Sequence, residues 1–409
     1  MNAMIKPTPW YFNPMTLLVA GCLVAIINFG IRSTFGQFTV PISTAHQWPR
    51  EVFSWAVALQ NLLWGIGTPI AGMLADRYGS ARVLIAGAIM YALGIMGMNY
   101  SDTGWMLDLT AGLLVGLGVA FSSFSIVMAA LGRLVPPEKR SWAFGLATAS
   151  GSMGQALFTW PVGYTVSQFG WHNGLWALAL LALLIIPLSL PLLIQNTSKS
   201  APVKGETAIT MGAAIKVAFA HPSYLLLVAG FFVCGFQLAF ITVHFPPYLA
   251  EHGISKEVGW LAMLLIGLFN VIGAYSSGII GGKFIKRVPL SAIYFARAAI
   301  YTIFILTPIT TTSTLLFAAA IGLLWLSTVP LTMGLVTVMF GTRYMATLYG
   351  FVFLSHQIGS FMGVWLGGRL YDLYGNYDVV WWMSVGLGLF AGLVHLPISE
   401  TRARAFAAA

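Results

Sequence analysis

Charged side chains are scarce in this chain of 409 residues, where Asp, Glu, Lys and Arg together make up only 8% of the sequence. A typical soluble domain has about 25% charged residues, and so few charges do not cover a water-exposed surface. Cysteine is also rare: only Cys22 and Cys234 are present, both inside apolar runs and without a CxxC or metal-ligand spacing. The sequence therefore argues against a water-soluble globular protein, a disulfide framework and a metal site.

Catalytic motifs are missing as well. There is no HExxH, no GxxxxGK and no GxSxG sequence, the patterns of zinc peptidases, nucleotide-binding loops and serine hydrolases. The net charge of +9 could indicate a nucleic-acid partner, but the basic residues lie singly or in pairs and form no extended patch. We therefore expect no enzyme activity, no catalytic residue, no cofactor and no nucleic-acid partner.

Hydrophobic residues make up 58% of the chain and come in long continuous runs. A helix needs about 20 apolar residues to cross a bilayer, and continuous rather than alternating runs favour helices over barrel strands. The sequence predicts an all-α membrane protein with twelve transmembrane helices, at residues 15–42, 52–74, 82–100, 105–133, 142–166, 172–195, 222–249, 257–282, 289–308, 313–340, 344–370 and 377–398.

One long polar break, from Gln195 to His221, divides these spans into two sets of six. We expect an N-terminal six-helix bundle at 1–195, a cytoplasmic linker at 196–221 and a C-terminal six-helix bundle at 222–409. Because each set has an even number of spans, the two bundles have the same orientation, an arrangement found in secondary transporters. A shift of 205 residues also aligns several Gly and Pro pairs and three tryptophan pairs: Trp55 with Trp260, Trp160 with Trp365, and Trp176 with Trp381.

The basic residues predict the orientation in the membrane, because cytoplasmic loops are enriched in Lys and Arg. The breaks that follow odd-numbered spans carry only Arg50 and Lys256, with Arg369 near the end of the eleventh span. We therefore expect both termini and the linker to be cytoplasmic. The remaining basic residues that support this lie at the termini, in the linker and in the breaks after even-numbered spans: Lys6, Arg77, Arg82, Arg133, Lys139, Arg140, Lys199, Lys204, Lys216, Lys283, Lys286, Arg287, Arg343, Arg402 and Arg404.

The loop between the second and third spans has the sequence GMLADRYGSAR, with Gly72, Asp76, Arg77, Gly79 and Arg82 at its key positions. Gly72 permits close helix packing, Gly79 permits a tight turn, and Asp76 can accept charge-assisted hydrogen bonds from a helix N-terminus or an arginine. The loop closely resembles the G-x-L-A-D-R-x-G-x-x-R motif of the major facilitator superfamily. The resemblance implies the major facilitator fold, and a conformational rather than substrate-binding function for this loop.

Within that superfamily the chain is similar to the bacterial monocarboxylate transporter and oxalate/formate antiporter branch. The fifth span begins with Lys139 and Arg140 and continues as a helix of small residues, and Arg32 falls near that family's intramembrane lysine. In the eighth span, Asn270 and either Ala274 or Tyr275 stand where the family has an Asp and Arg pair. The resemblance implies a secondary transporter of the cell inner membrane that works by alternating access.

Charges inside the spans are few, and each is expensive in a bilayer. Arg32 lies about 17 residues into the first span, where its guanidinium could bind a carboxylate bidentately. The alternative is a structural arginine bonded to helix carbonyls, and for Arg297 in the ninth span we favour that alternative. No Asp or Glu lies well inside any span, so a cavity around Arg32 would repel cations and favour anions.

His356 is the best buried titratable group, because an imidazole ordinarily titrates near neutral pH. A neutral, hydrogen-bonded packing histidine is the alternative. Other polar residues fall within spans, where hydrogen bonding between helices is the alternative to contact with a solute. We predict that the following residues contribute to a substrate site together with Arg32 and His356: Asn28, Gln60, Asn61, Gln155, Gln237, Asn270, Tyr275 and Gln357.

These observations predict a transporter of a small organic anion, a mono- or dicarboxylate, with possible coupling to protons or a counter-anion. We expect a monomer in the lipid bilayer whose partner is the small-molecule substrate. The alternative, favoured by the aromatic content, is export of a hydrophobic drug or metabolite.

Overall fold

The computed structural model describes residues 14–193 and 209–406. Within these ranges the chain is helical and contains no β-strand. The first half consists of α1 (Pro14–Ser33), η2 (Phe35–Phe38), α2 (Thr39–Ala45), α3 (Arg50–Tyr78), α4 (Ser80–Met98), α5 (Gly104–Leu107), the π-helical turn η3 (Asp108–Leu114), α6 (Val115–Phe121), α7 (Phe124–Leu134), η4 (Pro137–Lys139), α8 (Arg140–Leu183) and α9 (Ile185–Leu193).

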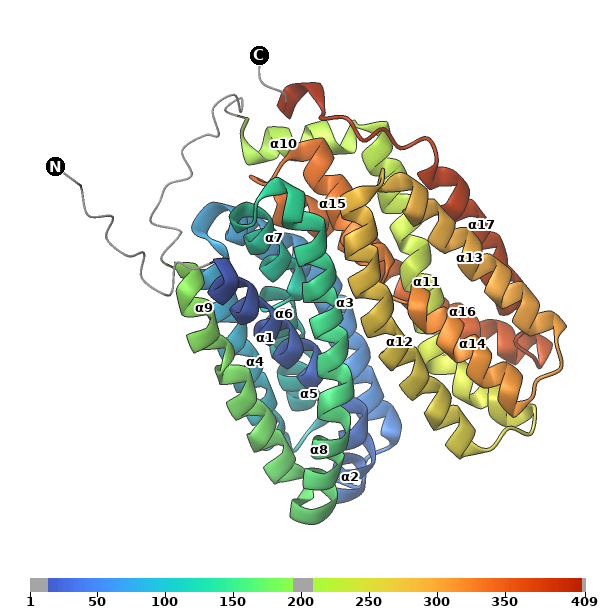
Figure 1. Ribbon diagram of the computed structural model, residues 1–409. Coiled ribbons are helices and arrows are strands. Elements are labelled where there is room, and N and C mark those ends of the chain that lie inside the picture. The colour runs from blue at the N-terminus through green and yellow to red at the C-terminus, as the bar shows by residue number, and fades with distance from the viewer. Residues whose placement is uncertain (1–13, 194–208, 407–409) are drawn as a thin grey trace.

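The second half repeats the pattern of long helices. It consists of α10 (Met211–Phe219), α11 (Pro222–Glu251), α12 (Lys256–Lys283), α13 (Arg287–Leu306), α14 (Thr311–Leu324), α15 (Thr328–Phe340), α16 (Met345–Tyr374), α17 (Asp378–His395) and η6 (Arg404–Phe406). In Figure 1 the blue-to-green half and the yellow-to-red half lie side by side and diverge toward the end where α8 turns back.

Ten segments of the described chain are long and apolar enough to span a membrane. One of them, residues 137–192, contains two passes, because the chain reverses at Gly170, where φ is 82°. Helix α16 adds a further pass of 30 residues whose apolar character is interrupted by Ser355, His356 and Gln357. The twelve predicted helices, six in each half, are therefore confirmed.

The expected linker is only partly described. Residues 194–208 lie outside the described ranges, but residues 211–219 form the short helix α10 rather than an extended connection. Its N-cap Thr210 accepts the N–H of Ala213, and Tyr344 donates a hydrogen bond to the carbonyl of Ile209 at 2.8 Å. Part of the sequence expected as linker thus packs against the second half.

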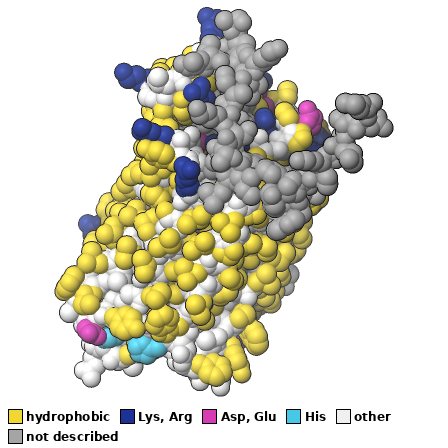
Figure 2. Space-filling view, turned by 90° about the vertical axis from the view of Figure 1, so that its left-hand side faces the viewer, with side chains coloured by type: hydrophobic (Ala, Val, Ile, Leu, Met, Phe, Trp, Pro, Cys, Tyr) yellow, Lys and Arg dark blue, Asp and Glu magenta, His cyan; other side chains and the backbone are white. Residues whose placement is uncertain are grey.

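The two ends of the helix bundle differ in charge. We call the end where α1 begins and α17 ends the terminal face, and the opposite end the distal face. Figure 2 shows Lys and Arg side chains gathered toward one end of a surface that is otherwise largely hydrophobic. By their places in the helices, the basic residues of the terminal face are Arg77, Arg82, Arg133, Lys139, Arg140, Lys216, Lys283, Lys286, Arg287, Arg343, Arg402 and Arg404.

Candidate functional site

The two halves meet where α3 packs against α16 and where α8 packs against α12. Glycines permit both close approaches. A Cβ on Gly145 of α8 would lie 2.6 Å from the Cα of Gly278 on α12, and one on Gly72 of α3 would lie 2.6 Å from the carbonyl carbon of Ala346 in α16. Because no side chain fits at these distances, the backbones touch and hold the halves together on the terminal side.

Polar side chains bridge the halves deeper in the bundle. Asn270 of α12 donates to Oγ of Ser152 on α8 at 2.8 Å and accepts the N–H of Leu326 at 3.0 Å. Gln357 of α16 donates to the backbone carbonyl of Asn61 on α3 at 3.2 Å. Ser152 and Gln357 are 205 residues apart, so equivalent positions of the two halves contribute to the two bridges.

Arg32 lies beside the second bridge, in the last turn of α1. Its guanidinium donates to Oδ1 of Asn61 at 2.6 Å, and its central carbon lies 4.3 Å from the centroid of the Trp64 ring. Helix dipole and ring quadrupole both favour a cation at this position. Among the described residues Arg32 has no acidic ion-pair partner, and a guanidinium has five N–H donors. The arrangement therefore leaves donors available to an anion.

The second half completes a closed circuit of contacts. Nδ1 of His356 lies 3.1 Å from Oε1 of Gln357, and the imidazole stacks on Phe353 with ring centroids 5.3 Å apart. The ring centroid of Phe353 in turn lies 4.9 Å from that of Trp64 in the first half. We call the residues of this circuit the central site: Arg32, Asn61, Trp64, Phe353, His356 and Gln357.

The central site has a polar and an aromatic side but no carboxylate. Its one full charge is that of Arg32, and the only ion pair among the described residues joins Asp76 to Arg133 at the terminal face. A charge without a counter-charge in a membrane span costs at least about 2.5 to 3.5 kcal/mol on insertion scales. An anionic ligand would offset that cost, whereas a cation would increase it.

Two of the predicted polar residues lie inside the first half instead. Asn28 is fully buried and donates to Oγ of Ser122 at 2.7 Å. Gln60 is 2% exposed and donates to the carbonyl of Ala111 at 3.2 Å. Both amides hold helices of one bundle together, so the structure differs here from the expectation that they line a cavity between the halves.

Gln237 differs from the expectation in the same way, because it is fully buried inside the second half. It donates to the carbonyl of Ser384 at 2.9 Å and accepts a hydrogen bond from Arg297 at 3.3 Å. Arg297 also donates to the carbonyls of Leu324 and Trp325, at 2.6 and 2.5 Å. These are the carbonyls at the end of α14, so Arg297 binds the point where α14 gives way to α15.

The remaining predicted residues belong to α8 and α12. Asn270 forms the bridge described above. Tyr275 is 39% exposed, and its hydroxyl accepts a hydrogen bond from Nε1 of Trp142 at 3.4 Å, so it lies at the edge of the contact. Gln155 is partly buried, and the described residues provide no hydrogen-bond partner for its side chain. Among the described residues, no group of three or more His, Cys, Asp or Glu could hold a metal ion.

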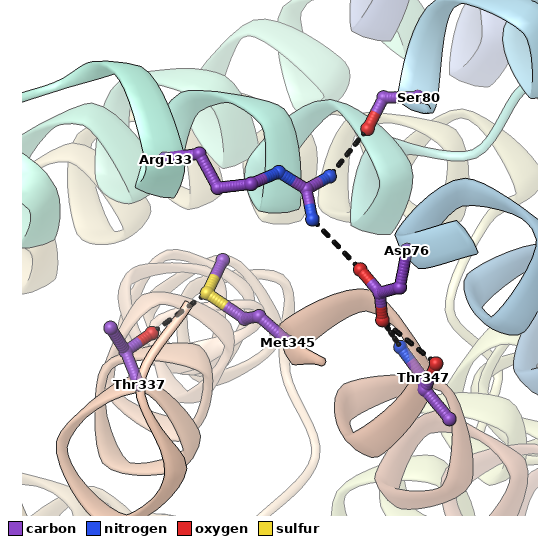
Figure 3. Close-up of polar contacts among 6 residues, drawn as sticks. All are labelled: Asp76, Ser80, Arg133, Thr337, Met345 and Thr347. Atoms are coloured by element: carbon purple, nitrogen blue, oxygen red, sulfur yellow. Dashed lines mark hydrogen bonds and ion pairs between the residues drawn. The ribbon is translucent and has the colours of Figure 1, made fainter. Parts of the chain in front are cut away.

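A second polar cluster lies at the terminal face, between α3, α7 and α16 (Figure 3). Asp76 accepts a hydrogen bond from Arg133 at 2.8 Å through one oxygen. Its other oxygen accepts the backbone N–H of Thr347 at 2.8 Å and the hydroxyl of Thr347 at 2.7 Å. Arg133 also donates to Oγ of Ser80 at 2.7 Å. We call Asp76, Ser80, Arg133 and Thr347 the Asp76 latch, because it ties the first half to the N-terminus of α16 in the second.

The other residues of the loop motif support this cluster or are solvent-exposed. Gly72 allows the close approach to α16, and Gly79, with φ of 98°, separates α3 from α4. Arg77 lies over the ring of Tyr78, 5.1 Å from its centroid, and Arg82 is exposed.

The sequence did not single out Trp64, Phe353 or Thr347, which complete the central site and the latch. Trp64 follows Asn61 by three residues, a spacing that places neighbours on one helix surface. Phe353 precedes His356 by the same spacing. These intervals were the available signal, but apolar residues at such spacing are common in every helix. Thr347 gave no comparable signal.

Comparisons with known proteins complement this geometry. The family model of the Major Facilitator Superfamily matches residues 21–364. Monocarboxylate transporter 13 of Bos taurus is 24% identical over 90% of this chain and 86% of its own length. The uncharacterized MFS-type transporter YcxA of Bacillus subtilis is 24% identical over 85% of this chain and 86% of its own length. The solved structure of the proton:xylose symporter XylE superposes with a TM-score of 0.72 at 15% identity, covering 95% of this chain and 97% of that one.

Proposed function

The chain belongs to the Major Facilitator Superfamily and is a secondary transporter in a membrane, and we propose that it carries a small organic monoanion bound at Arg32. The observation that carries this proposal is a guanidinium at the contact of the two halves, bound to an amide and a ring but to no carboxylate. The monocarboxylate transporters among its relatives support the same class of substrate.

One full positive charge favours a monocarboxylate over a dicarboxylate, because a second carboxylate would need a second cation within reach. The candidate for this second cation within the spans is Arg297. Its guanidinium is already hydrogen-bonded to two carbonyls and to Gln237 inside the second half. The rings of Trp64 and Phe353 suit a small apolar body attached to the carboxylate.

The central site lies between the halves, which supports transport by alternating access. In this conformation the Asp76 latch and the glycine contacts join the halves on the terminal face. We propose that the terminal face is cytoplasmic, as its excess of Lys and Arg indicates, in a chain located in the cell membrane. The structure would then represent a state closed toward the cytoplasm.

A binding experiment with the purified protein tests the substrate class. Thermal unfolding is followed with acetate, L-lactate, benzoate, succinate and tetraethylammonium, because a ligand of the folded state raises the apparent stability with its concentration. We expect one or more monocarboxylates to raise the Tm of the wild type and to have no effect on Arg32→Gln. A Tm shift that is the same in both proteins removes Arg32 from the site, and a shift with tetraethylammonium alone contradicts an anionic substrate.

A further inference from the structure

Trp64 contacts both the charged residue of the central site and the opposite half of the protein. It lies on α3 and is 5% exposed. The guanidinium carbon of Arg32 lies 4.3 Å from its ring centroid, and the ring of Phe353 on α16 lies 4.9 Å from it. One side chain thus connects the proposed anion site with a contact that joins the two halves.

The rings around this contact form a layer on the terminal side of Arg32 and His356. The ring centroid of Phe124 on α7 lies 5.8 Å from that of Phe353 and 6.4 Å from that of Tyr349, both on α16. It lies 5.2 Å from the ring centroid of Phe29 on α1. Phe29 precedes Arg32 on α1, and Tyr349 and Phe353 precede His356 on α16, so the layer lies nearer the terminal face. We call Phe29, Trp64, Phe124, Tyr349 and Phe353 the aromatic floor.

The aromatic floor is built from both halves, since α1, α3 and α7 belong to the first and α16 to the second. A solute leaving Arg32 toward the terminal face has to pass between these rings. The contacts of Phe353 with Trp64 and Phe124 must therefore separate when that face opens.

We infer that Trp64 is a positioning residue that couples the occupancy of Arg32 to the separation of the aromatic floor. This inference rests on the proposed function of Arg32. The empty guanidinium is attracted to the face of the Trp64 ring, and it donates a hydrogen bond to Asn61, one turn before Trp64 on the same helix, at 2.6 Å. A carboxylate that takes two guanidinium N–H groups competes with this contact. Binding then weakens the hold of Arg32 on Trp64, and with it the closed packing against Phe353.

The experiment measures the opening of the terminal face directly. Spin labels are placed at Glu138→Cys, before α8, and Lys283→Cys, at the end of α12, two exposed positions in opposite halves. The background carries Cys22→Ala and Cys234→Ala and is first shown to bind the same monocarboxylates as the wild type. The full-length protein in lipid nanodiscs gives label-to-label distances with and without saturating L-lactate, acetate or benzoate.

We expect a bound monocarboxylate to change the populations of the two states. The number of molecules with a long label-to-label distance, relative to the number with a short one, should rise by about tenfold, within the range of allosteric couplings. In Trp64→Leu the ratio should change less than twofold even when the anion is raised to the concentration at which the thermal shift of that variant reaches its maximum, so that weaker binding alone does not account for the lost response. Trp64→Phe keeps a smaller ring and should respond to an intermediate degree. An undiminished response in Trp64→Leu would overturn the inference.

Phe353→Leu removes the same ring contact with Trp64 from the side of the second half and leaves the contact of Arg32 with Trp64 in place. This variant should lose the response to the anion as Trp64→Leu does. It decides the question if Trp64→Leu does not fold. The matched control is Phe351→Leu, a ring on the same helix whose partner Phe219 belongs to its own half. A response lost in this control as well contradicts a specific coupling. Failure of the proposed function gives a different result. In that case neither the wild type nor any variant shows a thermal shift with a monocarboxylate that depends on Arg32.

Discussion

Removal of the Asp76 carboxylate should open the terminal face. In Asp76→Ala, Thr347 loses both of its hydrogen bonds to the first half, the backbone N–H at 2.8 Å and the hydroxyl at 2.7 Å. Hydrogen bonds to a charged group contribute about 1.5 to 3 kcal/mol each. Two of them give about 3 to 6 kcal/mol, which shifts the equilibrium between closed and open states by about 10²- to 10⁴-fold.

The loss acts mainly on the closed state, because Thr347 and Asp76 lie in different halves. Arg133 also loses its partner, but its side chain is 23% exposed and can be hydrated. The assay is the distance between spin labels at Glu138→Cys and Lys283→Cys. We expect long distances to dominate in Asp76→Ala without any ligand, and a smaller shift in Asp76→Asn, which keeps a neutral acceptor.

Ser80→Ala is the matched control, because it removes a hydrogen bond to Arg133 within one half, at 2.7 Å. The distances should then stay as in the wild type. If short distances still dominate in Asp76→Ala, the latch does not hold the halves together and the reasoning is refuted.

Three further predictions concern other parts of the bundle. Gly145→Leu should prevent closure, since a Cβ there already lies 2.6 Å from Gly278; the spin-label distances check this against Gly368→Leu, where no atom lies within 4 Å. Arg297→Met should lower the free energy of unfolding by about 1 to 3 kcal/mol for each carbonyl that loses its donor, those of Leu324 and Trp325; an unchanged Tm contradicts this structural function. His356→Gln should lower the initial rate of transport, because the imidazole that contacts Gln357 and stacks on Phe353 is lost, and an initial rate equal to that of the wild type would remove His356 from the site.

Hydropathy alone predicted the number of spans, but not where the helices break. The fourth span changes from α6 to α7 at Ser122 and Ser123, and the tenth changes from α14 to α15 just before Thr328. Ser122 and Ser327 are 205 residues apart, so the repeat explains why both halves break at the same depth. Serine and threonine are also ordinary residues inside apolar helices, so their presence alone does not indicate a break.

Prediction of the site residues from the sequence has a similar limit. Gln60 and Asn61 are neighbours in the sequence at the same membrane depth, but consecutive residues of a helix point about 100° apart. Gln60 consequently binds Ala111 inside its own half, whereas Asn61 binds Arg32 and contacts Gln357 of the other half. Residue type and depth can be read from a sequence, but the direction of a side chain requires knowledge of the packed neighbours.

The loop motif was more informative, because its residue types specify their partners. A buried Asp at the end of a span requires a donor, and both an arginine and a helix N-terminus meet it in the structure. Which arginine and which helix these are followed only from the fold. From the sequence alone, Arg133 indicates only the orientation in the membrane.

Exchange of a monocarboxylate across proteoliposomes tests the central claim most directly. Vesicles containing the purified protein are loaded with unlabelled L-lactate, acetate or benzoate, and entry of the same radiolabelled anion is followed. The wild type should accumulate label above protein-free vesicles, Arg32→Gln should not, and Arg297→Lys should retain exchange if it is folded. Exchange by Arg32→Gln at the wild-type rate would contradict the claim that the anion binds at Arg32.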